Sequence, residues 1–200
     1  SPNCRSKFTR LTRVSRIISG LAGSIKLKAA AKATRPTSDR VKESLFAKLE
    51  NLDAIEGAKV LDLYAGSGAL GLEAASRGAA EVILVDKDKA AIEVIRENIR
   101  IVSKAIGTSC LISAQNKEVS KVLKGLASSY DLVFIDPPYE LSNEAVTEDL
   151  SSLPNSLSDQ ALVVIERSSR TTDFDIPEAY ELEEKKTYGD TAVYLLRRVR

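Results

Sequence analysis

The sequence contains no histidine, tryptophan or methionine, and its only cysteines are Cys4 and Cys110. Without histidine, a Ser–His–Asp triad and most forms of zinc catalysis are excluded. Two cysteines so far apart in the chain make neither a disulfide framework nor a zinc site. We therefore expect two reduced thiols and no bound metal.

Long apolar runs are also absent. No segment approaches the roughly 20 apolar residues of a transmembrane helix, and no charged-then-apolar leader is visible near the start. We therefore expect a cytoplasmic protein that does not contact a membrane. We also expect a monomer. The chain has 200 residues, of which 44% are hydrophobic. These values predict one domain with a real core, or one domain with a small appendage.

Charge is distributed unevenly along the chain, although the net charge is only +1. Residues 1–48 contain 12 Lys and Arg against 2 Asp and Glu, whereas residues 49–200 contain 17 against 26. The asymmetry predicts a basic N-terminal extension (1–48) that contacts a polyanion, joined to an acidic main domain (49–200). A solvated basic tail is the alternative. The candidate phosphate-contacting residues are Arg13, Arg16, Lys26, Lys28, Lys32, Arg35 and Arg40. Of these, Arg35 and Arg40 could instead be structural.

The extension has a pattern of its own. Two short extended runs, 14–19 and 24–28, flank a glycine-containing turn and predict a β-hairpin. Apolar residues with helical spacing begin after Pro36, with Thr37 or Ser38 as the expected N-cap.

From residue 57 onwards, short apolar runs alternate with helical patterns. We predict strands at 59–64, 81–85, 109–113, 132–135 and 161–165, helices at 69–77, 88–102, 117–127 and 143–153, and a final antiparallel pair at 180–186 and 192–197. Alternating strands and helices indicate an α/β fold with a doubly wound parallel sheet. The final hairpin makes the sheet mixed.

A glycine-rich turn follows the first of these strands. It reads Gly66-x-Gly68-x-x-Gly71, and Asp86 ends the next strand. Glycines allow a tight turn and a close approach to a ligand, while the acid binds the hydroxyls of a ribose. Asp62 precedes the turn, where a carboxylate accepts the ammonium of an amino-acid tail but repels a pyrophosphate. This favours S-adenosylmethionine over NAD; a tight turn without a ligand is the plain alternative.

The tetrad Asp136-Pro137-Pro138-Tyr139 follows the apolar run 132–135. The prolines stiffen the chain because they fix φ and donate no hydrogen bond. The Asp136 carboxylate and the Pro137 carbonyl suit an exocyclic amino group, and Tyr139 suits the face of its ring. The alternatives are an ordinary strand-end acid and an ordinary exposed aromatic residue.

The two motifs should share one crevice. In a sheet that starts at its centre and reverses direction, the first and fourth strands are neighbours, so a methyl donor and an amino acceptor would meet there. Glu166 ends the fifth strand and is expected either at the rim of this crevice or in solvent.

These motifs resemble those of known enzymes. The segment 62–68 resembles motif I of class I S-adenosylmethionine-dependent methyltransferases, and the tetrad resembles the motif of those that methylate exocyclic amino groups of bases. A closer resemblance, over about residues 14–198, is to the RsmD family. It rests on RIISG at 16–20, RPTSDRVKESLF at 35–46, GSGALGLEA at 66–74 and the tetrad.

The resemblance implies a Rossmann-like, seven-stranded sheet of order 3-2-1-4-5-7-6 with a small N-terminal extension that helps hold RNA. It implies methylation of N2 of a guanine in 16S ribosomal RNA, free or in an assembling small subunit. S-adenosylmethionine would be the cofactor, S-adenosylhomocysteine the product, and no metal would be needed.

The candidate catalytic residues are Asp136, Pro137, Pro138 and Tyr139. The candidate cofactor-binding residues are Asp62, Tyr64, Ala65, Gly66, Ser67, Gly68, Asp86, Lys87, Gln115 and Asp136. Gln115 stands where the family often has an acid near the adenine amino group, and its amide oxygen can accept the same hydrogen bond.

Three other functions remain open from the sequence. An adenine N6-methyltransferase acting on DNA or RNA would use the same tetrad. A non-catalytic RNA-binding protein could keep the fold, although both motifs are intact here. A nicotinamide oxidoreductase is disfavoured because no hydride-transfer site follows residue 86.

Overall fold

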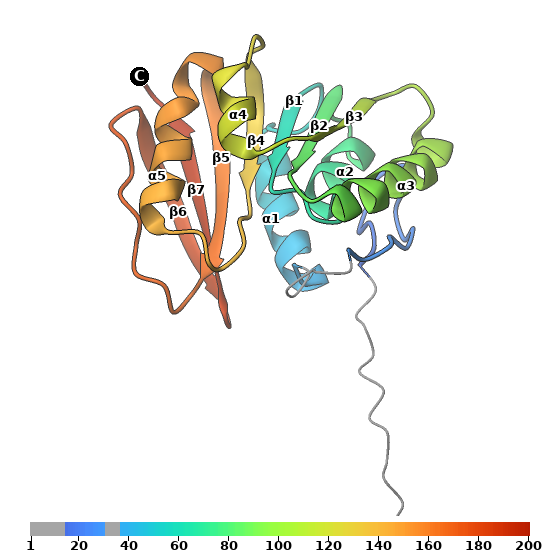
Figure 1. Ribbon diagram of the computed structural model, residues 1–200. Helices are drawn as coiled ribbons and strands as arrows, with labels where there is room; N and C mark the ends of the chain where they lie inside the picture. The colour runs from blue at the N-terminus through green and yellow to red at the C-terminus, as the bar shows by residue number, and fades with distance from the viewer. Residues whose placement is uncertain (1–14, 31–36) are drawn as a thin grey trace, which may run out of the picture.

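The buried apolar runs of the sequence form one sheet with helices on both faces (Figure 1). The computed structural model describes residues 15–30 and 37–200. The strands are β1 (Lys59–Leu63), β2 (Glu81–Asp86), β3 (Leu111–Asn116), β4 (Tyr130–Ile135), β5 (Leu157–Ser168), β6 (Tyr180–Tyr188) and β7 (Thr191–Arg198). The helices are α1 (Asp39–Asn51), α2 (Ala69–Ser76), α3 (Lys89–Ile106), α4 (Val119–Lys124) and α5 (Asn143–Ser152), with a 3₁₀ turn η1 (Pro154–Ser156).

The strand order is β3-β2-β1-β4-β5-β7-β6. All neighbouring pairs from β3 to β5 are parallel, while β7 pairs antiparallel with both β5 and β6. The predicted order and the mixed sheet are therefore confirmed. In the part of the chain that the structure describes, no helix has the length and apolar character to span a bilayer.

Several element boundaries differ from the prediction by a few residues, most of all in α3, β3 and β5. Helix α3 runs on to Ile106 and ends at Gly107, whose φ of +60° suits glycine. Strand β3 starts at Leu111, after the turn that follows α3. Strand β5 begins at Leu157 rather than 161. The edge strand β3 buries little on either face, so its alternation is weak in the sequence.

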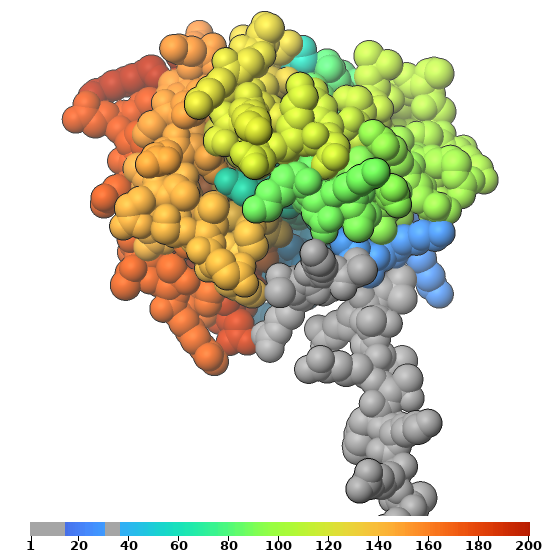
Figure 2. Space-filling view, in the orientation of Figure 1, coloured from blue at the N-terminus to red at the C-terminus, as the bar shows by residue number. Residues whose placement is uncertain are grey.

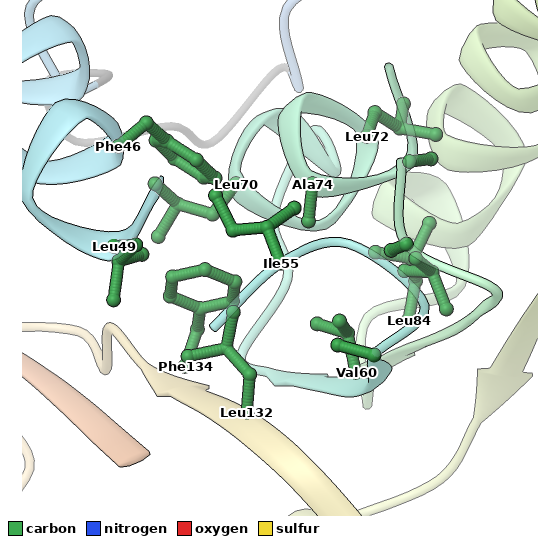
Figure 3. Close-up of a cluster of buried hydrophobic side chains, with 14 of the residues drawn as sticks. Phe46, Leu49, Ile55, Val60, Leu70, Leu72, Ala74, Leu84, Leu132 and Phe134 are labelled. Atoms are coloured by element: carbon green, nitrogen blue, oxygen red, sulfur yellow. The ribbon is translucent and has the colours of Figure 1, made fainter. Parts of the chain in front are cut away.

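Strand alternation divides the core into two clusters. Leu132 and Phe134 of β4 pack with α1, α2 and α3, whereas Val133 and Ile135 pack with α4 and α5. Figure 3 shows the first cluster, in which the rings of Phe46 and Phe134 lie 5.7 Å apart. Each such fully buried side chain contributes about 1.5–3 kcal/mol. The two layers hold the carboxyl ends of the strands at one rigid edge.

The described part of the N-terminal extension packs against this body. A single antiparallel bridge joins Arg16 and Lys26, where the sequence predicts a hairpin. The Glu73 carboxylate of α2 accepts the backbone N–H groups of Ile18 at 2.7 Å and Ser19 at 3.2 Å. Gly20 lies so close to α2 that a Cβ there would fall 2.0 Å from the Ser76 carbonyl oxygen.

Helix α1 connects the extension to the sheet. Ser38 is its N-cap, accepting from the Val41 N–H, as one of the two predicted caps. The expected boundary between residues 48 and 49 lies inside α1. Ile17 and Leu27 of the extension are buried in the same cluster as the first face of the sheet.

Candidate active site

Three acidic residues lie side by side where β1, β4 and β5 end. The register pairs Leu63 with Ile135 and Ile135 with Ile165, so Asp136 and Glu166 directly follow paired residues. Because side chains alternate along a strand, Asp62, Asp136 and Glu166 share the sheet face that α1 and α2 cover. All three line one cavity of about 500 Å³.

The cavity is built from distant parts of the chain. In Figure 2 the teal surface of the turn after β1 is recessed between the green segment after β2, the yellow segment after β3 and the orange α5. The predicted residues that line the cavity are Asp62, Tyr64, Ala65, Gly66, Ser67, Asp86, Lys87, Asp136, Pro137, Pro138 and Tyr139. We call the part formed by the glycine turn and the end of β2 the cofactor half, and the part formed by the tetrad, the end of β5 and α5 the acceptor half.

In the cofactor half, left-handed backbone shapes the glycine turn. Gly66 has φ +61° and Gly68, the N-cap of α2, has φ +85°. The Asp86 carboxylate accepts from the N–H of Gly66 at 3.0 Å and from that of Asp88 at 2.9 Å. The backbone of Tyr64 is also in the left-handed region, with a φ of +57°. Such a conformation costs a non-glycine residue about 1 kcal/mol or more.

Asp62 has an unsatisfied oxygen. Its Oδ2 accepts from the Gly71 N–H at 2.9 Å, whereas its buried Oδ1 has no hydrogen-bond partner. The pKa of Asp62 is raised to about 7, mainly by burial; the Gly71 N–H lowers it and the nearby Asp86 raises it. An orphaned carboxylate oxygen in a cavity wall fits a cationic ligand group such as an ammonium.

In the acceptor half, Asp136 and Glu166 form a pair of partly buried acids. The Thr37 hydroxyl, just before α1, donates to Glu166 Oε2 at 3.0 Å. Burial raises the pKa of Asp136 well above its usual range, and the nearby Glu166 and Asp62 raise it further. Burial also raises the pKa of Glu166. Of the two placements expected for Glu166, the structure has the one at the crevice.

Arg167 holds the tetrad loop in place. Its guanidinium Nη2 donates to the Leu141 carbonyl at 2.8 Å and to Asn143 Oδ1 at 3.0 Å. Beside it, the Tyr64 hydroxyl donates to Asp149 Oδ2 at 2.5 Å. The loop between β4 and α5 is thus fixed from β5, while Tyr139 at its tip is about half exposed (51%).

Some lining residues were not predicted. Thr37, Glu118, Val119, Ser120, Asp149 and Arg167 all line the cavity. Thr37 lies within the segment at 35–46 that the sequence singles out, but no pattern in a single sequence marks Asp149 or Arg167. Gln115 and Gly68 are outside the lining. Gln115 lies on the edge strand opposite Val85, and the chain reaches the cavity only after β3 has ended.

The extension also meets the cavity, through Ser15, Ala29 and Ala30. Fully buried Asn98 of α3 joins it to the cofactor half. Its side chain accepts the Lys28 N–H at 2.8 Å and donates to the carbonyls of Lys28 and Ser67, both at 2.9 Å. The Asn98 side chain therefore hydrogen-bonds both the glycine turn and the extension.

Only some of the basic residues predicted to contact phosphates lie within the described part of the chain. Lys26 and Arg40 are exposed. Arg16 pairs with Asp39 at 2.9 Å and Lys28 with Glu97 at 2.8 Å, both on the surface. Such exposed pairs contribute about 0–1 kcal/mol and release their cations readily. Arg13, Lys32 and Arg35 lie outside the described residues.

The strand order, the glycine turn followed by an acid and the tetrad on the neighbouring strand define a class I methyltransferase. The chain matches the family model "Conserved hypothetical protein 95" over residues 15–197 and belongs to that family, which is the RsmD family that the sequence resembles.

The chain is also similar to individual proteins, some by sequence and one by fold alone. Ribosomal RNA small subunit methyltransferase D of Escherichia coli is 33% identical over 164 residues, covering 82% of this chain and 79% of that protein. A solved structure of a Thermus thermophilus protein has a TM-score of 0.76 at 30% identity, covering 91% of this chain and 98% of that one. Magnesium protoporphyrin IX methyltransferase from Synechocystis, solved with S-adenosylmethionine bound, shares the fold (TM-score 0.62, 13% identity, 80% and 79% covered).

Proposed function

We propose that the protein transfers the methyl group of S-adenosylmethionine to the N2 amino group of a guanine in small-subunit ribosomal RNA. The observation that carries the proposal is the placement of the tetrad beside the orphaned Asp62 oxygen in one cavity. A methyl-donor site and an amino-acceptor site thus open into the same space. The relative named for small-subunit ribosomal RNA supports the choice of RNA.

The residues of the cofactor half fit S-adenosylmethionine. Asp62 would accept the ammonium of its amino-acid part, and Asp86 the ribose hydroxyls. Glu118, Val119 and Ser120 line the cavity beyond β3, and we assign the adenine contact to them rather than to Gln115. Gly66 leaves room for close backbone approach, since nothing lies within 4 Å of a Cβ built there.

The bound cofactor supplies an electrophilic methyl group on a sulfonium, so the protein mainly has to position the acceptor. Asp136 and the Pro137 carbonyl would accept the two amino hydrogens and turn the nitrogen lone pair towards that methyl. As the N–C bond forms, the C–S bond breaks and the sulfonium becomes a neutral thioether. The amino proton leaves through Asp136 or to water. No histidine base is required.

The remaining chain would hold the RNA. Tyr139 would stack on the target base, which contributes about 1–3 kcal/mol, once the base has left its helix. The basic extension, residues 1–48, would follow phosphates, with residues 49–200 as the methyltransferase domain. We expect the protein to act as a monomer in the cytoplasm, with no membrane contact, on 16S RNA or an assembling small subunit.

A labelling experiment tests the proposal. The purified protein is incubated with radiolabelled S-adenosylmethionine and small-subunit RNA or particles from cells that lack the gene, and labelled nucleosides are identified by mass spectrometry. We expect N2-methylguanosine at one position. Label in N6-methyladenosine, from RNA or from a DNA control, would establish the adenine alternative. No transfer despite tight binding of S-adenosylhomocysteine would indicate an RNA-binding protein without catalysis.

A further inference from the structure

The tetrad by itself accepts any exocyclic amino group, but the acceptor half contains a second carboxylate. Glu166 stands on β5 next to Asp136, which directly follows β4; each comes one residue after the paired Ile165 and Ile135, on the same face of the sheet. Both line the cavity. A base whose amino group reaches Asp136 therefore presents its neighbouring ring atom to Glu166.

The three amino-bearing bases differ at that ring atom. In adenine, the ring nitrogen N1 beside the amino group is an acceptor, and so is N3 of cytosine. In guanine, the N1 beside the N2 amino group carries a hydrogen and is a donor. A carboxylate accepts hydrogen bonds and, when ionised, cannot donate one. When both are ionised, two adjacent carboxylates match two adjacent donors, and only guanine presents them.

Glu166 is also held in a fixed orientation. The Thr37 hydroxyl donates to its Oε2, and Thr37 directly precedes the N-cap of α1. The side chain lies in the cavity wall near the start of α1 and is only partly exposed. If a bound base covers it, an acceptor on the base that faced Glu166 would leave both groups unsatisfied, which is the situation that gives the strongest discrimination between similar ligands.

We propose that Glu166 selects guanine by accepting the ring N1–H while Asp136 accepts from the adjacent N2 amino group. The inference rests on the proposed function and adds the residue that decides the base. Glu166 would then contact substrate directly. In the competing explanations it only anchors Thr37, or only takes up the amino proton from Asp136.

The base analogue 2,6-diaminopurine separates these explanations. It keeps the 2-amino group of guanine, but its N1 is an acceptor. After the methylated position has been mapped, RNA is assembled with guanine or 2,6-diaminopurine at that position. We expect the wild-type protein to prefer guanine at least about 100-fold in kcat/KM, because sites built to hydrogen-bond a substrate reject analogues without the group this strongly.

The variant Glu166→Gln tests the residue itself. An amide can turn either its oxygen or its NH₂ towards the base, so the preference should fall to within about tenfold. Glu144→Gln, an exposed carboxylate on α5 outside the cavity lining, is the matched control and should keep the wild-type ratio. Affinity for S-adenosylhomocysteine and the unfolding midpoint show that each variant is folded.

The possible outcomes of these measurements distinguish the explanations. Equal rates of the wild-type protein on both RNAs overturn the inference, even if Glu166→Gln does not fold. A Glu166→Gln variant that slows both RNAs equally and keeps their ratio also overturns it, because anchoring or proton uptake gives that pattern. In both cases methylation of guanine leaves the proposed function standing. Label in adenine overturns the proposed function and the inference together.

Discussion

The cofactor half and the acceptor half of the cavity both contain buried or partly buried carboxylates. The two halves differ in the hydrogen-bond donors that they supply to these carboxylates. Asp86 accepts two backbone N–H groups of its own chain. Asp136 and Glu166 have raised pKa values, and the Thr37 hydroxyl donates a hydrogen bond to Glu166. Asp62 stands between these cases, with one oxygen satisfied and the other not.

The two halves of the cavity are therefore suited to different tasks, one to binding the cofactor and the other to the methyl transfer. A carboxylate supplied with donors is already oriented when the ligand arrives, so little is lost in binding it. Carboxylates crowded together with few donors are costly until a substrate provides more. The cofactor half is thus built for affinity, and the acceptor half for interactions that form only when the base enters. Four experiments examine this contrast.

The largest effect is expected from Asp136→Ala. Removing an acceptor that orients the reacting nitrogen should lower kcat by about 10²–10³, whereas affinity for S-adenosylhomocysteine should be preserved, because the cofactor half is intact. Rates are measured with labelled S-adenosylmethionine and affinities by calorimetry. Asp136→Asn keeps an acceptor oxygen and should lose less. An equal loss of affinity and rate would contradict the division into two halves.

Gly71→Ala should damage the cofactor half instead. A Cβ at this position would lie 2.4 Å from Leu84 Cδ2 and 3.1 Å from Asp62 Oδ2. We expect a loss of about 1–3 kcal/mol in stability, typical of overpacking, together with weaker binding of S-adenosylhomocysteine. The control is Gly125→Ala, where a Cβ would come no closer than 3.9 Å. Equal unfolding midpoints for the two variants would refute the expectation.

A smaller, pH-dependent effect should come from Asp62. With its pKa near 7, the carboxyl is mostly protonated below neutral pH and mostly ionised above it. The ammonium of S-adenosylhomocysteine needs the ionised form, so affinity should rise with pH, by about tenfold from pH 6 to pH 8. Asp62→Asn should bind more weakly with little pH dependence. A wild-type affinity that stays constant over this range would rule out the ammonium contact.

The smallest effect is expected on the RNA side. Lys26→Ala removes one exposed charge from the extension, so RNA binding should weaken a few-fold and the salt dependence of log Kd should flatten by about one unit or less. Lys104→Ala, an exposed lysine at the end of α3, should leave both unchanged. The two are compared by titrating small-subunit RNA at several salt concentrations. Identical slopes for the two variants would place the RNA elsewhere.

Much of this site was predictable because its motifs are local. The glycine turn, Asp86 and the tetrad each lie at the end of an apolar run, and parallel strands bring such ends to one edge. The strand order entered through the resemblance, since alternation alone does not give the order of strands. The N-cap of α1 followed from residue type.

The rest depends on contacts between distant segments. Asp149 belongs to the site because the Tyr64 hydroxyl reaches it across the sheet edge. Arg167 belongs because its position on β5 faces the loop after β4. The sequence places Gln115 just after an expected strand at 109–113, whereas β3 begins at Leu111 and continues through Gln115. The residue therefore lies within the edge strand and outside the cavity lining.

Asn98 has a consequence for local unfolding. Its three hydrogen bonds tie Lys28 of the extension to Ser67 of the glycine turn. The extension cannot detach at this point without leaving a buried amide unsatisfied, so the two segments open as one cooperative unit. Amide hydrogen exchange at Lys28 should therefore slow when S-adenosylhomocysteine binds, although that amide belongs to the segment proposed to hold RNA. Binding of the methyl donor would thus stabilise the RNA-binding extension against local unfolding.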